Sequence, residues 1–182
     1  MLKNKAIVKA QINSLSKPEL VEIVLKLAGK RYNYEFLLVN YLDKEGGEQV
    51  LFDEAKEDID NLNKKTYKGR SVQHQLAKRL NACTKRIAEF KVETKSKKLE
   101  ADLILYVLDK QFMNPTKVFG ARYSGYDYKV ALLLKRLVTL VTQRLHPDYL
   151  IDYQYKTNDY LARLHKTSNR LNTVRELPRT LE

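Results

Sequence analysis

The sequence contains little cysteine, glycine or proline: Cys83 is the single cysteine, and there are six glycines and four prolines among 182 residues. One cysteine cannot form an intrachain disulfide or a cysteine-based zinc site, and it fits a reducing cytoplasm. Few glycines and prolines are typical of long helices with short connections, and they disfavour a β-sandwich. The first residues contain no apolar run long enough for a signal peptide, so we expect a cytoplasmic protein.

Sequence motifs for catalysis and metal binding are also lacking. The three histidines are scattered along the chain, at His74, His146 and His165. None belongs to a paired metal-binding motif, and there is neither a glycine-rich phosphate loop nor a nucleophile elbow. Glu54, Glu57 and Asp58 lie one turn apart, but a hard cation needs several converging oxygens, so we interpret them as an exposed acidic face. We therefore expect no enzymatic activity, cofactor, metal or small-molecule ligand.

Positive charge, in contrast, is abundant. The formal net charge is +12 and the isoelectric point about 9.6, while 43% of the residues are hydrophobic. That apolar share is enough for one core, and we expect a single all-α domain over residues 1–182 with a flexible tail from about residue 173. The charge favours an acidic partner such as nucleic acid, an anionic membrane surface or an acidic protein, although a basic protein can also lack such a partner.

The most apolar stretch of the chain, residues 127–145, predicts a central helix. Its apolar residues recur every three or four positions, the spacing of one helix face; they are Val130, Leu134, Leu137, Val141 and Leu145. A helix that is apolar over most of its circumference has to be surrounded by other elements. Lys135 and Arg136 interrupt the stretch, which disfavours a membrane span. We predict an all-α fold, an irregular bundle of about seven or eight helices around this one.

Start and stop signals mark the other helices. Ser16 and Glu19 have the spacing of a capping box, and Asn33 is a candidate N-cap for the helix after it. Gly46-Gly47 is the strongest break in the chain, and Asn114-Pro115 is expected to end a helix. With the apolar periodicity, these signals predict helices over residues 3–14, 17–28, 34–42, 48–66, 71–92, 99–113 and 147–171.

The string LSKPELVEIVLKLAGKRYNYEFLL, which begins at Leu15, carries a resemblance to known proteins. Residues 15–42 resemble the opening of an uncharacterised family of small bacterial helical proteins, a domain of unknown function. Its members begin with a Leu-Ser-Lys-x-Glu-Leu helix start, followed by an apolar helix and a short second helix. The resemblance implies an all-α fold and brings no activity, cofactor or catalytic residue.

Charge is distributed unevenly along the chain. Residues 43–60 carry eight acidic and two basic side chains, whereas residues 64–98 carry twelve basic and two acidic ones. A row of basic side chains can contact a phosphate backbone or an acidic partner; the candidates are Arg70, Lys78, Lys85, Arg86, Lys95, Lys97 and Lys98. The alternative, which we favour, is that this basic helix pairs with the acidic helix before it, because two antiparallel helices would place opposite charges side by side.

The helix predicted over residues 71–92 has an apolar seam on its other side. Its residues follow at steps of three and four, so the helix is expected to lie along a partner helix at a shallow angle; they are Val72, Leu76, Leu80, Cys83, Ile87 and Phe90. Cys83 belongs to this seam, and we interpret it as a buried small hydrophobe and not a nucleophile.

Tyrosines gather in the last third of the chain. A tyrosine suits an interface because its ring buries apolar area while its hydroxyl stays hydrogen-bonded; the candidate interface aromatics are Tyr123, Tyr126, Tyr128, Tyr149 and Tyr153. Stacking on unpaired bases is a second use. The third possibility is a half-buried ring packed between helices.

Our leading hypothesis from the sequence is a non-catalytic helical protein-interaction or scaffold module. Its partner would be an acidic protein or a second copy, and its contact surface would be the 116–128 loop together with the tyrosine-bearing helix. The alternative is a nucleic-acid-binding protein that uses the basic 64–98 stretch. Neither hypothesis involves a membrane.

Overall fold

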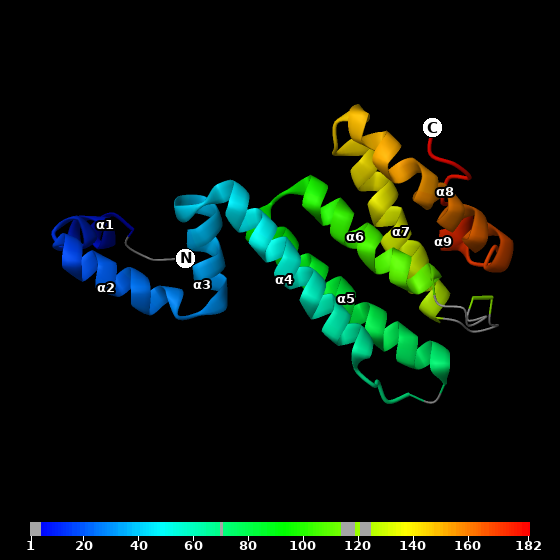
Figure 1. The fold of residues 1–182 in the computed structure, drawn as a ribbon, viewed down its shortest axis with the longest axis horizontal. Coiled ribbons are helices and arrows are strands. Elements are labelled where there is room, and N and C mark those ends of the chain that lie inside the picture. Colours follow the sequence, from blue (N-terminus) through cyan, green and yellow to red (C-terminus); the bar gives the residue numbers. More distant parts are fainter. Residues whose placement is uncertain (1–4, 70, 114–118, 121–124) are drawn as a thin grey trace. The chain divides into compact units, whose positions relative to one another are not determined.

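A computed structural model describes residues 5–69, 71–113, 119–120 and 125–182 of the chain. These residues form α-helices with short connections and contain no β-strand, which confirms the all-α prediction (Figure 1). Eight of the α-helices in the described ranges have seven residues or more. The backbone contacts divide the chain into two compact units, Met1–Gly47 and Glu48–Glu182. That the chain forms a single domain stays a prediction.

The unit Met1–Gly47 consists of short helices. They are α1 (Lys5–Asn13), α2 (Lys17–Ala28), α3 (Arg31–Leu37) and the π-helix η1 (Leu38–Leu42). The predicted capping box at the start of α2 is confirmed: the Ser16 hydroxyl accepts from the Glu19 N–H at 3.4 Å, and the Glu19 carboxylate accepts from the Ser16 N–H at 2.8 Å. Both side chains satisfy backbone donors that a helix N-terminus otherwise leaves without partners.

Two of the predicted boundaries in this part of the chain are wrong. Asn33 is no N-cap, because α3 already begins at Arg31; its amide instead donates to the Leu27 carbonyl at 2.7 Å, at the end of α2. Gly46-Gly47 does not interrupt a helix but lies in the first turn of α4 (Lys44–Lys64). A Cβ on Gly47 would lie 2.9 Å from Leu38 Cγ, so glycine is needed there for a close approach and not for a break.

The unit Glu48–Glu182 is built around a central helix, as predicted. It contains α5 (Val72–Thr94), α6 (Lys97–Phe112), α7 (Gly125–Gln143), the 3-10 helix η2 (Pro147–Tyr149), α8 (Leu150–Thr167) and α9 (Asn172–Arg175), after most of α4. Helix α7 packs against α5, α6, α8 and α9. Val130, Leu134 and Leu137 on α7 are completely buried, so the core of this unit follows its apolar face.

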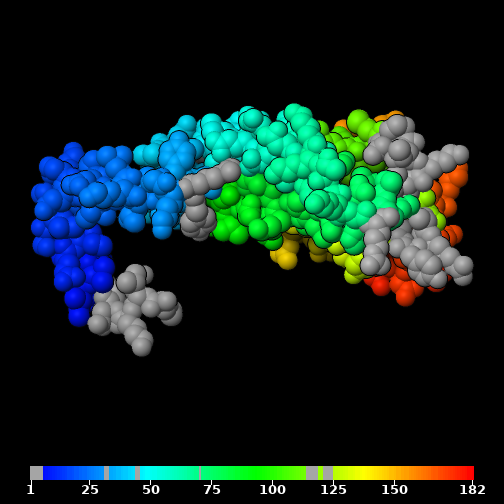
Figure 2. All heavy atoms as spheres, turned by 90° about the horizontal axis from the view of Figure 1, so that it is seen from below, coloured from blue at the N-terminus to red at the C-terminus, as the bar shows by residue number. Residues whose placement is uncertain are grey.

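Helices α4 and α5 run antiparallel, side by side along this unit (Figures 1 and 2). The rings of Phe52 on α4 and Phe90 on α5 lie 6.1 Å apart, and Asp58 on α4 forms an ion pair with Arg86 on α5. The contact later in α4 is thus made to the residue earlier in α5, which shows that the two helices are antiparallel. The predicted seam of α5 is buried from Leu76 to Phe90. Its first residue, Val72, is 58% exposed and does not belong to the core.

The C-terminal tail packs against the rest of its unit, and its flexibility stays a prediction. Val174, Leu177 and Leu181 are buried, and the Leu181 N–H donates to the Asn158 side chain on α8 at 2.7 Å. Apolar side chains spaced three and four residues apart have enough buried area to hold a short segment in place. The predicted stop at Asn114-Pro115 lies outside the described residues.

None of the helices in the described ranges is long and apolar enough to cross a membrane.

Candidate anion-binding site

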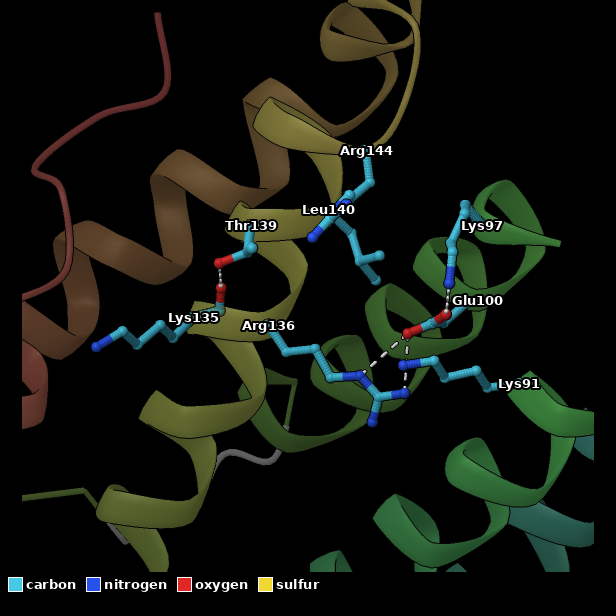
Figure 3. Close-up of a pocket in the computed structure, with 8 residues that line it drawn as sticks. All are labelled: Lys91, Lys97, Glu100, Lys135, Arg136, Thr139, Leu140 and Arg144. Carbon is cyan, nitrogen blue, oxygen red and sulfur yellow. Dashed lines mark hydrogen bonds and ion pairs between the residues drawn. The ribbon is translucent and has the colours of Figure 1, made fainter. Parts of the chain in front are cut away.

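A basic cleft lies where the end of α5, the start of α6 and the second half of α7 meet (Figure 3). Its volume is about 560 Å³. The residues that line it include five cationic side chains and one carboxylate; the lining consists of Lys91, Lys97, Glu100, Lys135, Arg136, Thr139, Leu140 and Arg144. We call this feature the basic cleft.

The connection between α5 and α6 brings two of the lysines together. Helix α5 ends at Thr94, and Lys95 adopts a left-handed backbone with φ of 59°, which reverses the chain within two residues. The Ser96 hydroxyl then accepts from the Leu99 N–H at 3.4 Å and caps the start of α6. Lys91 and Lys97 therefore reach the same cleft from opposite sides of the turn.

Helix α7 and the residue after it supply the other side of the cleft. Arg136 and Leu140 are four residues apart and Arg144 follows after another four, so they lie on one side of the helix. The Thr139 hydroxyl donates to the Lys135 carbonyl at 2.9 Å and has no hydrogen left for a ligand. Lys135 points away from the centre of the cleft (Figure 3) and forms an ion pair with Glu176 at 2.8 Å.

Glu100 is the carboxylate of the cleft, and it orients the arginine. The Nε and Nη2 atoms of Arg136 donate to Oε1 of Glu100 at 3.2 and 2.9 Å. Lys97 Nζ lies 3.6 Å from the other oxygen, and the Glu100 side chain is only 1% exposed. Glu100 therefore fixes the guanidinium in the cleft but leaves its lining with an excess of positive charge.

The chemistry of this lining suits phosphate or carboxylate groups. Lysine and arginine offer hydrogen-bond donors with full positive charge, and no aromatic ring belongs to the lining. Lys91, Lys97 and Arg136 point into the cleft from three different helices (Figure 3).

Of the predicted basic contacts, Lys97 is the one that lines the basic cleft. Lys78 is exposed on α5 and donates to the Lys68 carbonyl at 2.8 Å, while Lys85 lies on the same helix, 3.8 Å from Glu89. Lys98 pairs with Asp102 at 2.8 Å. Lys95 is exposed in the turn, and Arg70 lies outside the described residues. The predicted contacts thus do not form one surface.

Arg86 is a correction to the predicted row, because it is buried and only 6% exposed. Its Nε donates to Asp58 of α4 at 2.8 Å, and its Nη1 donates to Glu93 at 3.0 Å. This contact is the pairing between basic and acidic helices that we favoured from the sequence. It uses Arg86 as a structural group between α4 and α5 and removes it from any nucleic-acid contact.

The lysine and the two arginines that line the cleft from α7 and its end do not belong to the basic contacts predicted from the sequence. In the sequence, Lys135 and Arg136 indicate only an interruption of an apolar stretch. A signal was present for the two arginines, since they are eight residues apart and lie on one side of the helix. Its meaning depends on the turn between α5 and α6, which brings Lys91 and Lys97 to that side.

The candidate interface aromatics do not form one surface either. Tyr126 is buried, stacks on Phe119 with ring centroids 5.5 Å apart, and donates to Gln111 at 3.1 Å. Tyr153 is also buried, whereas Tyr128 and Tyr149 are 46% and 37% exposed. Tyr123 lies outside the described residues. Tyr126 and Tyr153 therefore pack between helices and are buried more deeply than the half-buried rings considered from the sequence.

Two buried tyrosines of α8 connect this helix to α6. The Tyr153 hydroxyl donates to Asp102 at 2.6 Å, and the Tyr160 hydroxyl donates to Asp109. Both the tyrosines and the aspartates are seven residues apart, so the two helices run parallel in a constant register. Asp102 also forms an ion pair with Lys98, and Asp109 forms one with Lys156. Each tyrosine hydroxyl therefore donates to a carboxylate that is also paired with a lysine.

Alkaline pH is expected to destabilise the protein through these phenols. Burial, together with the hydrogen bond to Asp102, raises the pKa of Tyr153 above its ordinary value, and burial and Asp109 raise the pKa of Tyr160. The unfolded chain loses these protons near pH 10 while the folded state keeps them, so the free energy of unfolding falls as the pH rises above about 10. Each tyrosine adds about 1.4 kcal/mol per pH unit to this fall.

Urea denaturation at a series of alkaline pH values measures this slope. Tyr153→Phe and Tyr160→Phe should each reduce it, whereas Tyr155→Phe, at a side chain that is 87% exposed, should leave it unchanged. An equal slope in all four proteins would contradict the assignment to Tyr153 and Tyr160.

Cys83 has the environment predicted for it. The side chain is completely buried, and burial raises the pKa of the Cys83 thiol to about 11. Because the thiolate is the reactive form, this cysteine is a poor nucleophile at neutral pH. Within the described ranges, no three His, Cys, Asp or Glu side chains are grouped so that they could hold a metal ion.

No protein-family model, curated protein or solved structure matches the chain. The resemblance of residues 15–42 to an uncharacterised helical family stays a prediction.

Proposed function

We propose that the protein binds nucleic acid through its phosphate backbone, with the basic cleft as the main contact. The observation that carries this proposal is the convergence of Lys91, Lys97, Arg136 and Arg144 from three helices around one cleft that contains a single carboxylate. Cationic side chains that neutralise phosphates release counterions, and this release supplies most of the affinity of sequence-independent binding.

The composition of the cleft supports a backbone contact and not the reading of bases. Base recognition in single strands uses aromatic platforms, and the lining has none. Arg136 is held by Glu100 and cannot turn freely toward a base edge. The net charge of +12 favours the same class of partner over the whole molecule. We therefore expect weak sequence preference and strong salt dependence.

A free phosphate compound is the other source of the same chemistry. Pockets for small molecules are mostly apolar, with a few polar groups that fix orientation. Most of the side chains that line the basic cleft are charged instead, which favours a polymer that supplies many phosphates. Inorganic phosphate and a mononucleotide are therefore included as probes beside duplex DNA and single-stranded RNA.

The test is a charge reversal inside the cleft compared with the same reversal outside it. Lys91→Glu with Arg144→Glu should weaken binding of a short DNA duplex by about 30-fold or more at low salt and reduce the salt slope by about 2, since two phosphate contacts are lost. Arg136 is left intact because Glu100 depends on it. Fluorescence anisotropy over a salt series measures both quantities.

The matched control is Lys78→Glu with Lys85→Glu. It makes the same change in net charge at two exposed positions of α5 outside the basic cleft. At about 0.15 M salt, where the Debye length is about 8 Å, the control should retain the affinity of the unchanged protein to within about 3-fold, because neither side chain lines the cleft. Equal losses in both variants, or binding of mononucleotide without binding of polymer, would overturn the proposal.

A further inference from the structure

The unit Met1–Gly47 exposes an unusual amount of apolar surface. It holds more of the exposed large hydrophobic side chains than Glu48–Glu182, although the latter is nearly three times as long. Among its described side chains, Val39 alone is a buried hydrophobic. A segment of this size cannot assemble a sufficient core by itself. Burial of this apolar surface therefore requires contact with another molecule or segment.

Helix α2 is the centre of this surface, and none of its twelve residues is buried. Leu25 is 67% exposed and Leu27 56% exposed, and Val21, Ile23 and Val24 are exposed as well. With about 100° between successive residues, Glu19, Glu22 and Lys26 share one narrow strip and apolar side chains occupy most of the remaining circumference. A contiguous apolar surface of this kind on a well-capped helix marks an interaction site.

We propose that α2 is a self-association surface, on which the α2 helix of a second copy packs in antiparallel orientation. The charges of α2 favour this partner. Its first half carries Lys17, Glu19 and Glu22, a net charge of −1, while Lys26 and Lys30 lie at its end, and Glu22 and Lys26 already pair at 2.7 Å. An antiparallel copy places the acidic half of each helix beside the basic end of the other. A parallel copy would place like charges together.

The charged strip of Glu19, Glu22 and Lys26 disfavours the other binding partners that an exposed apolar helix can have. Helices that lie on anionic membranes carry lysine and arginine on the polar face, whereas this strip contains two glutamates and one lysine. A strongly acidic or strongly basic protein would meet like charge on one half of α2. In a contact between two copies related by a twofold axis, the first half of each α2 helix lies beside the end of the other. Both halves therefore meet opposite charge.

The expected interface is of modest size. A helix of twelve residues is about 18 Å long, and one helix face alone falls short of the roughly 800 Å² per partner of a standard interface. Exposed apolar side chains on the neighbouring helices, such as Ile12 and Phe36, add to it. We expect a reversible dimer with a dissociation constant in the micromolar range, about 1–50 µM.

Sedimentation equilibrium of the full chain tests this proposal. The unchanged protein should form dimers, and Leu25→Glu should raise the dissociation constant about 10-fold or more, because a charge would be placed in the apolar contact. Leu25 is exposed, so the variant is expected to keep its helical circular dichroism spectrum. Ile151→Glu is the matched control, since Ile151 is 76% exposed on α8 and should not affect dimerisation.

A charge exchange tests the antiparallel arrangement separately. Lys26→Glu should weaken the dimer, and Glu22→Lys combined with Lys26→Glu should restore it, because the exchanged charges are again complementary to a second exchanged copy. Val24→Cys gives a further readout, since Cys83 is buried and the introduced thiol is the accessible one. Its oxidation should link two copies covalently.

Other outcomes would overturn the proposal. A chain that stays monomeric up to about 100 µM, or a dimer that persists in Leu25→Glu, would show that α2 is not the contact. Binding of α2 to anionic vesicles by a monomeric protein would identify a membrane as the occupant instead. Because Lys91 and Arg144 lie outside α2, loss of nucleic-acid binding on their reversal with the dimer unchanged would separate the two proposals.

Discussion

Replacement of Arg86 by methionine is expected to lower the free energy of unfolding by about 3–5 kcal/mol. Arg86 is buried on α5, and its guanidinium contacts Asp58 of α4 and Glu93 of its own helix. Methionine fills a similar volume but brings no charge, so Glu93, whose side chain is 8% exposed, loses this cationic partner. Removal of one partner from a buried ion pair is costly because the remaining charge stays away from water.

Lys85→Met is the matched control for this prediction. Lys85 precedes Arg86 on the same helix, but its side chain is 81% exposed and its contact with Glu89 is 3.8 Å long. Exposed pairs of this kind contribute about 0–1 kcal/mol, so the control should unfold at nearly the same urea concentration as the unchanged protein. A loss below about 1 kcal/mol for Arg86→Met would contradict the structural role of Arg86.

A second substitution can identify the cause of the loss. Glu93→Gln added to Arg86→Met removes the carboxylate charge that Arg86 contacted and keeps a similar side-chain shape. The double variant should therefore recover part of the stability, as whole buried pairs can be replaced at lower cost than single members. If the double variant is less stable than Arg86→Met, packing of the arginine stem and not its charge accounts for the effect.

The helices could be predicted because their signals are local. The capping box at Ser16 and the periodicity of residues 127–145 depend on neighbours within one or two turns, and both features are present. The predictions differ from the structure where residues that usually mark a helix boundary or a loose end instead make contacts with other segments. Gly47, within α4, allows a close approach to Leu38 instead of breaking a helix, and the apolar residues of the tail pack on α8.

The basic cleft could not be predicted to the same extent, because it depends on tertiary structure. Sequence reasoning treated the residues 64–98 as one row, but Arg86 turns inward toward Asp58 while Lys97 turns toward Arg136. No periodicity within one helix distinguishes these two outcomes. The positions of α4 and α7 decide them, since α4 presents a carboxylate and α7 presents cations.

The register between α6 and α8 is an intermediate case. Asp102 and Asp109 are seven residues apart, as are Tyr153 and Tyr160, so a pairing of tyrosine with aspartate was visible in the sequence. Reading it required the knowledge that α6 and α8 run parallel, which follows from the antiparallel helix α7 that connects them. An excess of tyrosine therefore indicates an interface only after such internal partners have been sought.

Truncation of Leu134 to alanine is the second large effect expected, a loss of about 2–5 kcal/mol in the free energy of unfolding. Leu134 is completely buried on α7, the helix that packs against α5, α6, α8 and α9. The neighbouring helices are held by ion pairs such as Arg136 with Glu100, so they cannot close fully over the vacated volume. The loss therefore combines the transfer of the missing methyl groups with a residual cavity.

Leu132→Ala on the same helix is the control, because Leu132 is 43% exposed. Alanine has a slightly better helix propensity than leucine, so this variant should lose less than about 1 kcal/mol. Urea denaturation followed by circular dichroism compares the two. Similar losses would mean that α7 is not enclosed on the Leu134 side. A large loss for Leu134→Ala alone would show that the buried face of α7 makes a large contribution to the stability of this unit. The same helix carries Arg136, which lines the basic cleft.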